Sequence, residues 1–268
     1  MPELPEVENV RLTLKNILPT GSRFKRITLN RPDLRFPFPE QLAEKLKGQR
    51  LLNIDRRAKY LVFETEKYLL LSHLGMTGSW RELVADEVHD HVVWEFESGP
   101  TLVFNDPRRF GFISLHLKSE TPSHFVDLGP EPLSSEFYAE YLFAISRKKN
   151  TPLKSFLLDQ KIVAGLGNIY VCEALFLAGL KPARRAQTLK LVESERLVKA
   201  IQNILKQAIR AGGSTIRDYK NADGKSGEFQ ERFRVYGRDG EKCRTCRKPI
   251  KLVRQAGRST YWCPQCQK

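Results

Sequence analysis

Four of the five cysteines lie in two pairs near the C-terminus, with two residues inside each pair and sixteen between the pairs. Each pair presents two thiolates from one tight turn, and four thiolates complete the tetrahedral shell that Zn²⁺ prefers. Two disulfides are the alternative, which the reducing environment of a protein that is not secreted disfavours. The spacing therefore predicts one structural Zn²⁺ with no open coordination position, held by Cys243, Cys246, Cys263 and Cys266.

The first residues of the chain offer a nucleophile. Removal of Met1 would expose the secondary amine of Pro2. An α-amino group has a pKa near ~7.7–8, so part of it is neutral and nucleophilic at physiological pH. Glu3 is adjacent, and a carboxyl group can transfer protons near neutral pH if burial raises its pKa. Taken by themselves, Pro2 is an ordinary terminus and Glu3 an ordinary charge at a helix start. Glu6 and Glu8 are assigned to the helix start and to the surface.

The charge of the chain indicates a polyanionic partner. The 268 residues include 45 Lys+Arg against 31 Asp+Glu, a formal net charge of +14. Residues 214–268 alone carry 14 Lys+Arg and 6 Asp+Glu, a net charge of +8. A basic excess of this kind attracts nucleic acid through counterion release and steers association. The alternative is a basic surface that only keeps the protein in solution.

The elements that would position these residues change character along the chain. Apolar residues follow helical spacing from 6 to about 18. Short β-rich runs over 22–117 predict packed antiparallel sheets. Proline and glycine indicate a linker over 121–136, helical spacing returns over 137–211, and the polar stretch 214–230 is predicted to be a loop. The predicted strands are Leu51–Asp55, Tyr60–Glu64, Tyr68–His73, His91–Glu97, Thr101–Asn105 and Gly111–His116.

Membrane and secreted proteins are excluded as classes. No apolar run approaches the ~18–20 residues that a membrane span needs. The acidic N-terminus lacks the basic and apolar regions of a signal peptide. The sequence accordingly predicts a cytoplasmic protein. Cys172, the fifth cysteine, is expected to be a small buried side chain in a helix.

Eight short motifs resemble those of the bacterial formamidopyrimidine-DNA glycosylase family. They follow one another in the family's order, and the resemblance covers the whole chain. Chance agreement at so many sites is negligible. The motifs are PELPEVE at 2–8, RRAKYL at 56–61, HLGMTG at 73–78, DPRRFG at 106–111, LGPEPL at 128–133, GLGNIY at 165–170, VYGR at 235–238 and GRSTYWC at 257–263.

The resemblance implies an α+β fold: an N-terminal antiparallel β-sandwich flanked by helices, and a C-terminal helix–two-turns–helix domain with the four-cysteine zinc finger. It implies a bifunctional DNA glycosylase and abasic-site lyase of base excision repair. Such an enzyme excises oxidised purines (8-oxoguanine and formamidopyrimidines) and cleaves the strand by β,δ-elimination. Its partner is double-stranded DNA containing oxidised purines or abasic sites, bound by a monomer. The expected domains are a catalytic sandwich (1–120), a linker (121–136), a helix–two-turns–helix domain with a lesion-capping loop (137–230) and the finger (231–268).

Four residues match the family's catalytic positions. Pro2 would attack the sugar C1′, displace the base and form a Schiff base, whose iminium promotes elimination first at the 3′ and then at the 5′ phosphate. Glu3 would shuttle protons for base release. Lys59 would contact phosphate and assist the chemistry, although most lysines beside an apolar strand extend into solvent. Arg258 would grip phosphates with its planar guanidinium, and its alternative is an exposed arginine between two cysteine turns.

A base must leave the helical stack before it can be excised, so such an enzyme must also fill the space left behind. The resemblance assigns Met76 and Phe110 as apolar plugs and Arg108 as the partner of the orphaned base. By composition alone, Met76 and Phe110 would be core residues. The resemblance further assigns phosphate and backbone contacts, with His89 chosen over its neighbour His91 on the motif alone; the residues are His89, Lys149 and Asn168.

Two other classes compete with this interpretation. A zinc-ribbon DNA-binding protein without chemistry would need only the basic C-terminal region, and it leaves the matches at Pro2, Glu3 and Lys59 unexplained. A glycosylase of the endonuclease VIII type, which prefers oxidised pyrimidines, shares the proline and the glutamate. That type has glycine where Leu4 stands and lacks the full set of space-filling residues. The motifs therefore favour the purine enzyme.

Overall fold

The computed structural model of the protein describes residues 2–214, 227 and 229–268. The chain forms two compact units, the first made of Met1–Val126 with Ala211–Glu228 and the second of Asp127–Arg210 with Phe229–Lys268. Each unit contains a cluster of buried apolar side chains. Among the described residues, no helix combines the length and the apolar character needed to cross a membrane.

The first unit is built on two antiparallel sheets of four strands each. Successive side chains of a strand point to opposite faces, so each sheet can turn one apolar face inward. In β3, for example, Leu61, Phe63 and Thr65 are buried and the residues between them are half-buried. In spatial order, the first sheet consists of β1 (Phe24–Leu29), β6 (Asp90–Phe96), β7 (Leu102–Asn105) and β5 (Ser79–Glu82). The second sheet consists of β2 (Leu51–Arg57), β3 (Tyr60–Thr65), β4 (Tyr68–His73) and β8 (Phe112–Leu117), again in spatial order.

Aromatic side chains join the two sheets. Phe63 of β3 lies edge-on against Trp94 of β6, with 4.9 Å between ring centroids. Trp80 of β5 contacts both, at 5.7 Å from Phe63 and 4.0 Å from Trp94. All three side chains are buried in one apolar cluster. The first unit is therefore a β-sandwich, as predicted.

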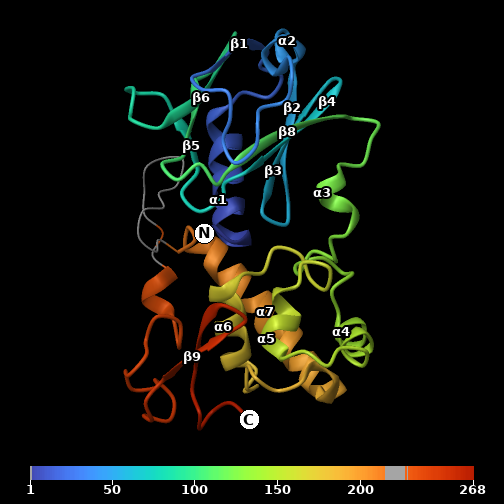
Figure 1. Ribbon diagram of the computed structural model, residues 1–268, viewed down its shortest axis with the longest axis vertical. Coiled ribbons are helices and arrows are strands. Elements are labelled where there is room, and N and C mark those ends of the chain that lie inside the picture. The colour runs from blue at the N-terminus through green and yellow to red at the C-terminus, as the bar shows by residue number, and fades with distance from the viewer. Residues whose placement is uncertain (1, 215–226, 228) are drawn as a thin grey trace. The chain divides into compact units, whose positions relative to one another are not determined.

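Helix α1 (Leu4–Ile17) packs along β2 and β3, where Figure 1 shows it beside the sheet. Its buried residues include Val7, Val10 and Leu14, which share one face because they are three and four positions apart. Pro5 lies in the first turn, where a missing N–H costs nothing. Two short helices, α2 (Leu42–Leu46) and α3 (Ser123–Val126), complete the unit.

The second unit is mainly helical. Its long helix α7 packs against α4 and α6. Buried Glu173 of α6 accepts backbone N–H groups from Arg234, Val235 and Tyr236 at 2.8, 2.9 and 2.8 Å, and so holds the segment that leads into the finger. The helices are α4 (Ala139–Ser146), α5 (Leu153–Leu158), α6 (Asn168–Leu177), η1 (Ala186–Thr188), α7 (Leu191–Arg210) and η2 (Phe229–Arg232).

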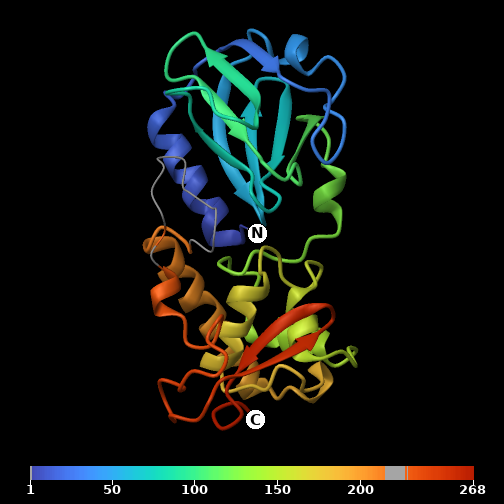
Figure 2. The ribbon, with the colours of Figure 1, turned by 60° about the vertical axis from the view of Figure 1, so that its left-hand side comes forward.

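Between its two cysteine pairs, the finger contains a hairpin of β9 (Lys251–Gln255) and β10 (Arg258–Trp262). Ala256 and Gly257 form its two-residue turn, and both have positive φ, as hairpin turns that match the twist of the strands require. Strand β10 contacts α6, and Figure 2 shows the red hairpin beside that helix.

The predicted fold class is confirmed, and all six predicted strands are present with ends shifted by at most two residues. The sequence interpretation missed β1, β5, β9 and β10. In β1, Lys25 and Arg26 interrupt the apolar alternation, and pairing with β6 supplies the order that the local pattern lacks. The predicted linker 121–136 contains α3. The predicted loop 214–230 lies mostly outside the described residues.

Candidate active site

Pro2 and Glu3 directly precede α1, and both are buried. Glu3 is the N-cap residue with 2% of its surface exposed, and it forms a reciprocal capping box with Glu6. The Glu6 carboxylate accepts the Glu3 N–H at 2.8 Å. The backbone beside the Pro2 nitrogen is thus held by the helix itself.

Glu6 also binds the first residue of the predicted loop, Ser214. Its other carboxylate oxygen accepts the N–H of Ser214 at 2.8 Å and the hydroxyl of Ser214 at 2.9 Å. The predicted place of Glu6 at the helix start is confirmed. The surface assignment of Glu8 is wrong, because Glu8 is half-buried between Arg11 and Arg56 at 2.5 and 2.9 Å. Helical spacing could not indicate that Arg56 of β2 lies against this face.

Lys59 occupies the turn between β2 and β3, next to Ala58 with φ 53°. Only 8% of Lys59 is exposed, so it does not extend into solvent as most lysines in such positions do. His73 on β4 pairs with Tyr60 of β3. Burial, followed by the positive charges of Lys59 and Arg35, lowers the pKa of His73 to about 4. A neutral His73 therefore lies near the Lys59 amine throughout the physiological pH range.

The predicted space-filling residues come together at the ends of two loops. Met76 and Phe110 are 39% and 42% exposed, which is unusual for side chains of their size and excludes the core role that composition favoured. The Arg108 guanidinium lies over the Phe110 ring, 4.7 Å from its centroid. His89 is exposed with φ 77°, whereas His91 is buried and its Nε2–H donates to the Asp106 carbonyl at 2.9 Å.

In the second unit, Arg258 is exposed at the first position of β10. Asn168, the first residue of α6, donates its side-chain N–H at 2.9 Å to the carbonyl of Ser259, the residue that follows Arg258 in β10. Lys149 is half-buried beyond the end of α4. The structure therefore brings Asn168 to the hairpin of Arg258, and Lys149 lies after α4.

Sequence reasoning missed Lys154 of α5. Its ammonium group donates to the Ser259 carbonyl at 2.7 Å and to the Thr260 hydroxyl at 2.6 Å, and the residue is buried. Lysine in a short helix normally faces water, so no local signal indicates this position. Lys154 and Asn168 together hold the strand that begins with Arg258.

The four cysteines of the finger form a metal site. Their sulfur atoms all lie within 4.8 Å of one another, with 3.4 Å between Cys246 and Cys263 and 3.9 Å between Cys243 and Cys266. A tetrahedral shell with Zn–S bonds of about 2.3 Å separates its sulfurs by about 3.8 Å. The donor set and its spacing therefore fit one structural Zn²⁺. Cys172 is buried as a small side chain in the apolar cluster that also contains Cys243 and Cys263.

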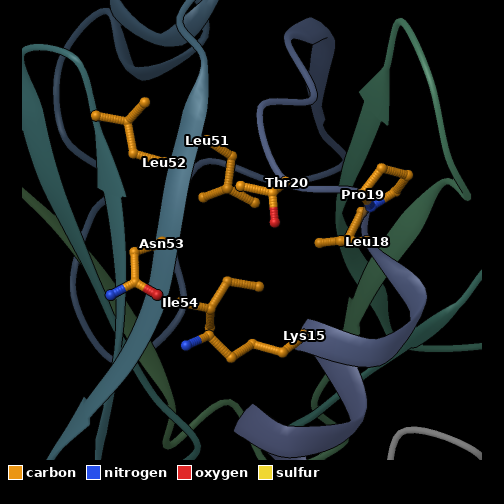
Figure 3. A pocket seen from close by; sticks show the side chains of 8 residues that line it. All are labelled: Lys15, Leu18, Pro19, Thr20, Leu51, Leu52, Asn53 and Ile54. Carbon is orange, nitrogen blue, oxygen red and sulfur yellow. The ribbon is translucent and has the colours of Figure 1, made fainter.

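A small pocket in the first unit is separate from these residues (Figure 3). It lies between the end of α1 and β2, has a volume of about 250 Å³, and is lined by residues that include Lys15, Thr20 and Asn53. Pro2 and Glu3 lie at the opposite end of α1, a helix of 14 residues. None of the residues that line the pocket was predicted as a site residue.

A β-sandwich with a proline before its first helix, a helical unit and a four-cysteine finger define a zinc-finger DNA glycosylase. Family models agree along the chain: the formamidopyrimidine-DNA glycosylase N-terminal domain matches residues 1–113, the H2TH domain of the same glycosylase matches 128–220, and a zinc finger found in Fpg and IleRS matches 240–268. The chain belongs to the formamidopyrimidine-DNA glycosylase family. The predicted family, enzyme class and zinc finger are thereby confirmed.

Full-length relatives support the same membership. The chain is 48% identical to the formamidopyrimidine-DNA glycosylases of Bradyrhizobium sp. (strain ORS 278) and Bdellovibrio bacteriovorus, with 100% of each chain covered. The MutM (Fpg) protein of Thermus thermophilus is 39% identical, with a TM-score of 0.90 over 99% of this chain and 98% of that one. Lactococcus lactis Fpg bound to DNA with an abasic site is 38% identical, with a TM-score of 0.91 over 100% of both chains.

Proposed function

We propose that the protein excises formamidopyrimidines and 8-oxoguanine from duplex DNA and then cleaves the strand at the abasic site, with the Pro2 amine as nucleophile. The observation that carries this proposal is the burial of Pro2 and Glu3 at the start of α1, in a chain that matches its family from end to end. Lactococcus lactis relatives have been solved with Fapy-dG and abasic-site DNA, which supports this substrate class. Removal of Met1 is a requirement, because only then is the Pro2 nitrogen an amine.

The remaining catalytic groups are assigned by their surroundings. The Glu3 carboxyl is largely removed from bulk water, so it can exchange a proton with the departing base without competition from solvent. The buried Lys59 amine lies near neutral His73 and supplies positive charge for a phosphate or for the developing base anion. Arg258 is exposed, and its guanidinium can bind two phosphate oxygens at once.

The DNA contacts follow from exposure and charge. The half-exposed Met76 and Phe110 fill the space that the flipped nucleotide leaves, and Arg108 bonds the orphaned base. His89, Lys149 and Asn168 bind the phosphate backbone.

The division of labour along the chain follows the domains that the sequence predicted. We assign catalysis to 1–120, the linker to 121–136, DNA binding and lesion capping to 137–230, and the metal-bound finger to 231–268. The protein acts as a monomer with one Zn²⁺. Because bacterial chromosomal DNA is its substrate, it works in the cytoplasm.

Borohydride trapping tests the proposed function. Borohydride reduces an iminium between protein and DNA to a stable adduct, so incubation with a duplex containing 8-oxoguanine opposite C should yield one covalent complex of protein and DNA. A duplex with an oxidised pyrimidine should give much less. A DNA-binding protein without chemistry would give no adduct, and a glycosylase of the endonuclease VIII type would show the opposite preference.

Replacement of Arg258 should separate the two elimination steps. Arg258→Ala should weaken binding to a lesion duplex about tenfold and lower the salt slope of binding by about one unit, because one phosphate contact is lost. Arg258→Lys keeps the charge but loses the planar fork, so its loss should be smaller. In both variants, the product cleaved only on the 3′ side should accumulate on sequencing gels.

Arg254→Ala is the matched control, since Arg254 is an exposed arginine that pairs with Ser259 in the same hairpin. Its product ratio should equal that of the wild type. An unchanged product ratio and an unchanged salt slope in Arg258→Ala would make Arg258 an ordinary surface arginine.

A further inference from the structure

One buried carboxylate connects the loops of the first unit that carry Met76, Arg108 and Phe110. Asp106 follows β7 and is fully buried. One of its carboxylate oxygens accepts the hydroxyl of Thr77 at 2.5 Å, and the other accepts the N–H of Gly111 at 2.8 Å. The side chain thus bonds the residue after Met76 and the residue after Phe110.

The backbone of Asp106 extends the same connection to the loop of His89. Its N–H donates to the His89 carbonyl at 3.1 Å. Its carbonyl accepts the Arg109 N–H at 3.1 Å and the ring N–H of His91 at 2.9 Å. The hydroxyl of Thr77 in turn accepts the Arg108 N–H at 3.2 Å. Three loops that are distant in the sequence therefore meet at one residue.

Close backbone packing leaves these loops little freedom. At Gly75, which has φ +64°, an added Cβ would lie 2.3 Å from the backbone carbon of Phe110. At Gly111, an added Cβ would lie 2.9 Å from the His73 carbonyl oxygen and 3.0 Å from the Asp106 carboxylate. His73, kept neutral by the burial that lowers its pKa to about 4, accepts the Gly75 N–H at 3.0 Å. Backbone contacts thus fix the two loops, while the side chains of Met76, Arg108 and Phe110 remain exposed.

We propose that Asp106, acting through Thr77, is a positioning residue that holds Met76, Arg108 and Phe110 in the arrangement needed to enter a DNA stack. This inference rests on the proposed function. Loops that are already ordered before binding lose little conformational entropy when they enter the duplex, so the protein binds a lesion duplex more tightly than it would with flexible loops. Asp106 touches no reacting atom in this scheme.

The loop arrangement that Asp106 and Thr77 hold matters only where a space in a DNA stack must be filled. An abasic site in single-stranded DNA leaves no hole in a duplex and has no orphaned partner base. Loss of this loop arrangement should therefore lower the preference for a lesion duplex and spare the reaction of the Pro2 amine with a single-stranded abasic site. A general loss of folding would lower both.

The test uses Thr77, because removal of the buried Asp106 carboxylate would also destabilise the unit. Thr77→Val keeps the shape of the side chain and removes the hydroxyl, and Thr77→Ser restores it. Thr28→Val is the matched control, since Thr28 is a half-buried threonine in β1. The measured quantity is the ratio of dissociation constants for an undamaged duplex and for the same duplex with a tetrahydrofuran abasic-site analogue. Borohydride trapping on a single-stranded abasic site is measured in parallel.

Thr77→Val should lower this ratio about tenfold, the order expected for one hydrogen bond to a charged group. Thr77→Ser and Thr28→Val should keep the wild-type ratio, and single-strand trapping should stay the same in all three. An unchanged ratio in Thr77→Val, or an equal loss on the single strand, would overturn the inference. If the wild-type protein formed no adduct at all, the proposed catalytic function would fail, while the binding ratios would still decide the role of Asp106.

Discussion

Replacement of Pro2 by glycine is expected to lower the rate of 8-oxoguanine excision by at least about a hundredfold, while binding to lesion DNA survives. The proline ring fixes the direction of its nitrogen relative to the backbone, and small misplacements of a reacting group cost about this much. Glycine also presents a primary amine, whose Schiff base can lose its N–H proton and become a neutral imine, which is a weaker electron sink for the elimination than the iminium that proline forms. Pro2 is buried directly before α1, so the helix start fixes where its nitrogen lies.

Single-turnover excision on an 8-oxoguanine duplex measures this effect. Mass spectrometry of each preparation establishes whether Met1 has been removed, since a retained methionine blocks the amine. Pro19→Gly is the matched control, because Pro19 is an exposed proline of the same unit beyond the end of α1. Excision by Pro2→Gly at the wild-type rate would show that the N-terminal amine is not the nucleophile.

Removal of zinc is expected to abolish specific binding to lesion DNA, with a loss of about a hundredfold or more. Structural Zn²⁺ contributes about 10–16 kcal/mol to the folding of small zinc fingers, so the metal-free finger should unfold. The apolar cluster that contains the finger cysteines has few other buried side chains to stabilise the finger, among them Val235 and Ile250. Arg258 lies on the hairpin between the two cysteine pairs, so its position depends on the metal.

Metal content by mass spectrometry, together with binding after chelation, tests this expectation. Cys246→Ser should lose both zinc and binding, and restoring zinc to the chelated wild-type protein should recover binding. Cys172→Ala is the control, because Cys172 is buried beside the finger and lies outside the group of metal ligands. Full nicking activity in protein shown to be free of metal would contradict the structural role of the ion.

The agreement between sequence and structure is best where the signal is local. The cysteine spacing indicates a tetrahedral site because each pair forms its half of the shell within a single turn. Strand Tyr60–Thr65 could be located because its buried residues alternate with half-buried ones, and Tyr68–His73 because it contains a continuous run of leucines. Strand β5, with four residues and two charges, has too short a pattern to be found that way.

The sequence by itself determined the family, the fold class, the metal ligands and the identity of the residues proposed for chemistry, because those depend on residue type and on order along the chain. Only the tertiary structure decided that Glu8 bonds Arg56, that Lys154 holds the strand of Arg258, and that Asp106 joins three loops. The Lys154 contact with Ser259 spans 105 positions, and that of Asp106 with Thr77 spans 29. A buried charge takes its role from the donors and acceptors that packing brings to it, and no local pattern specifies them.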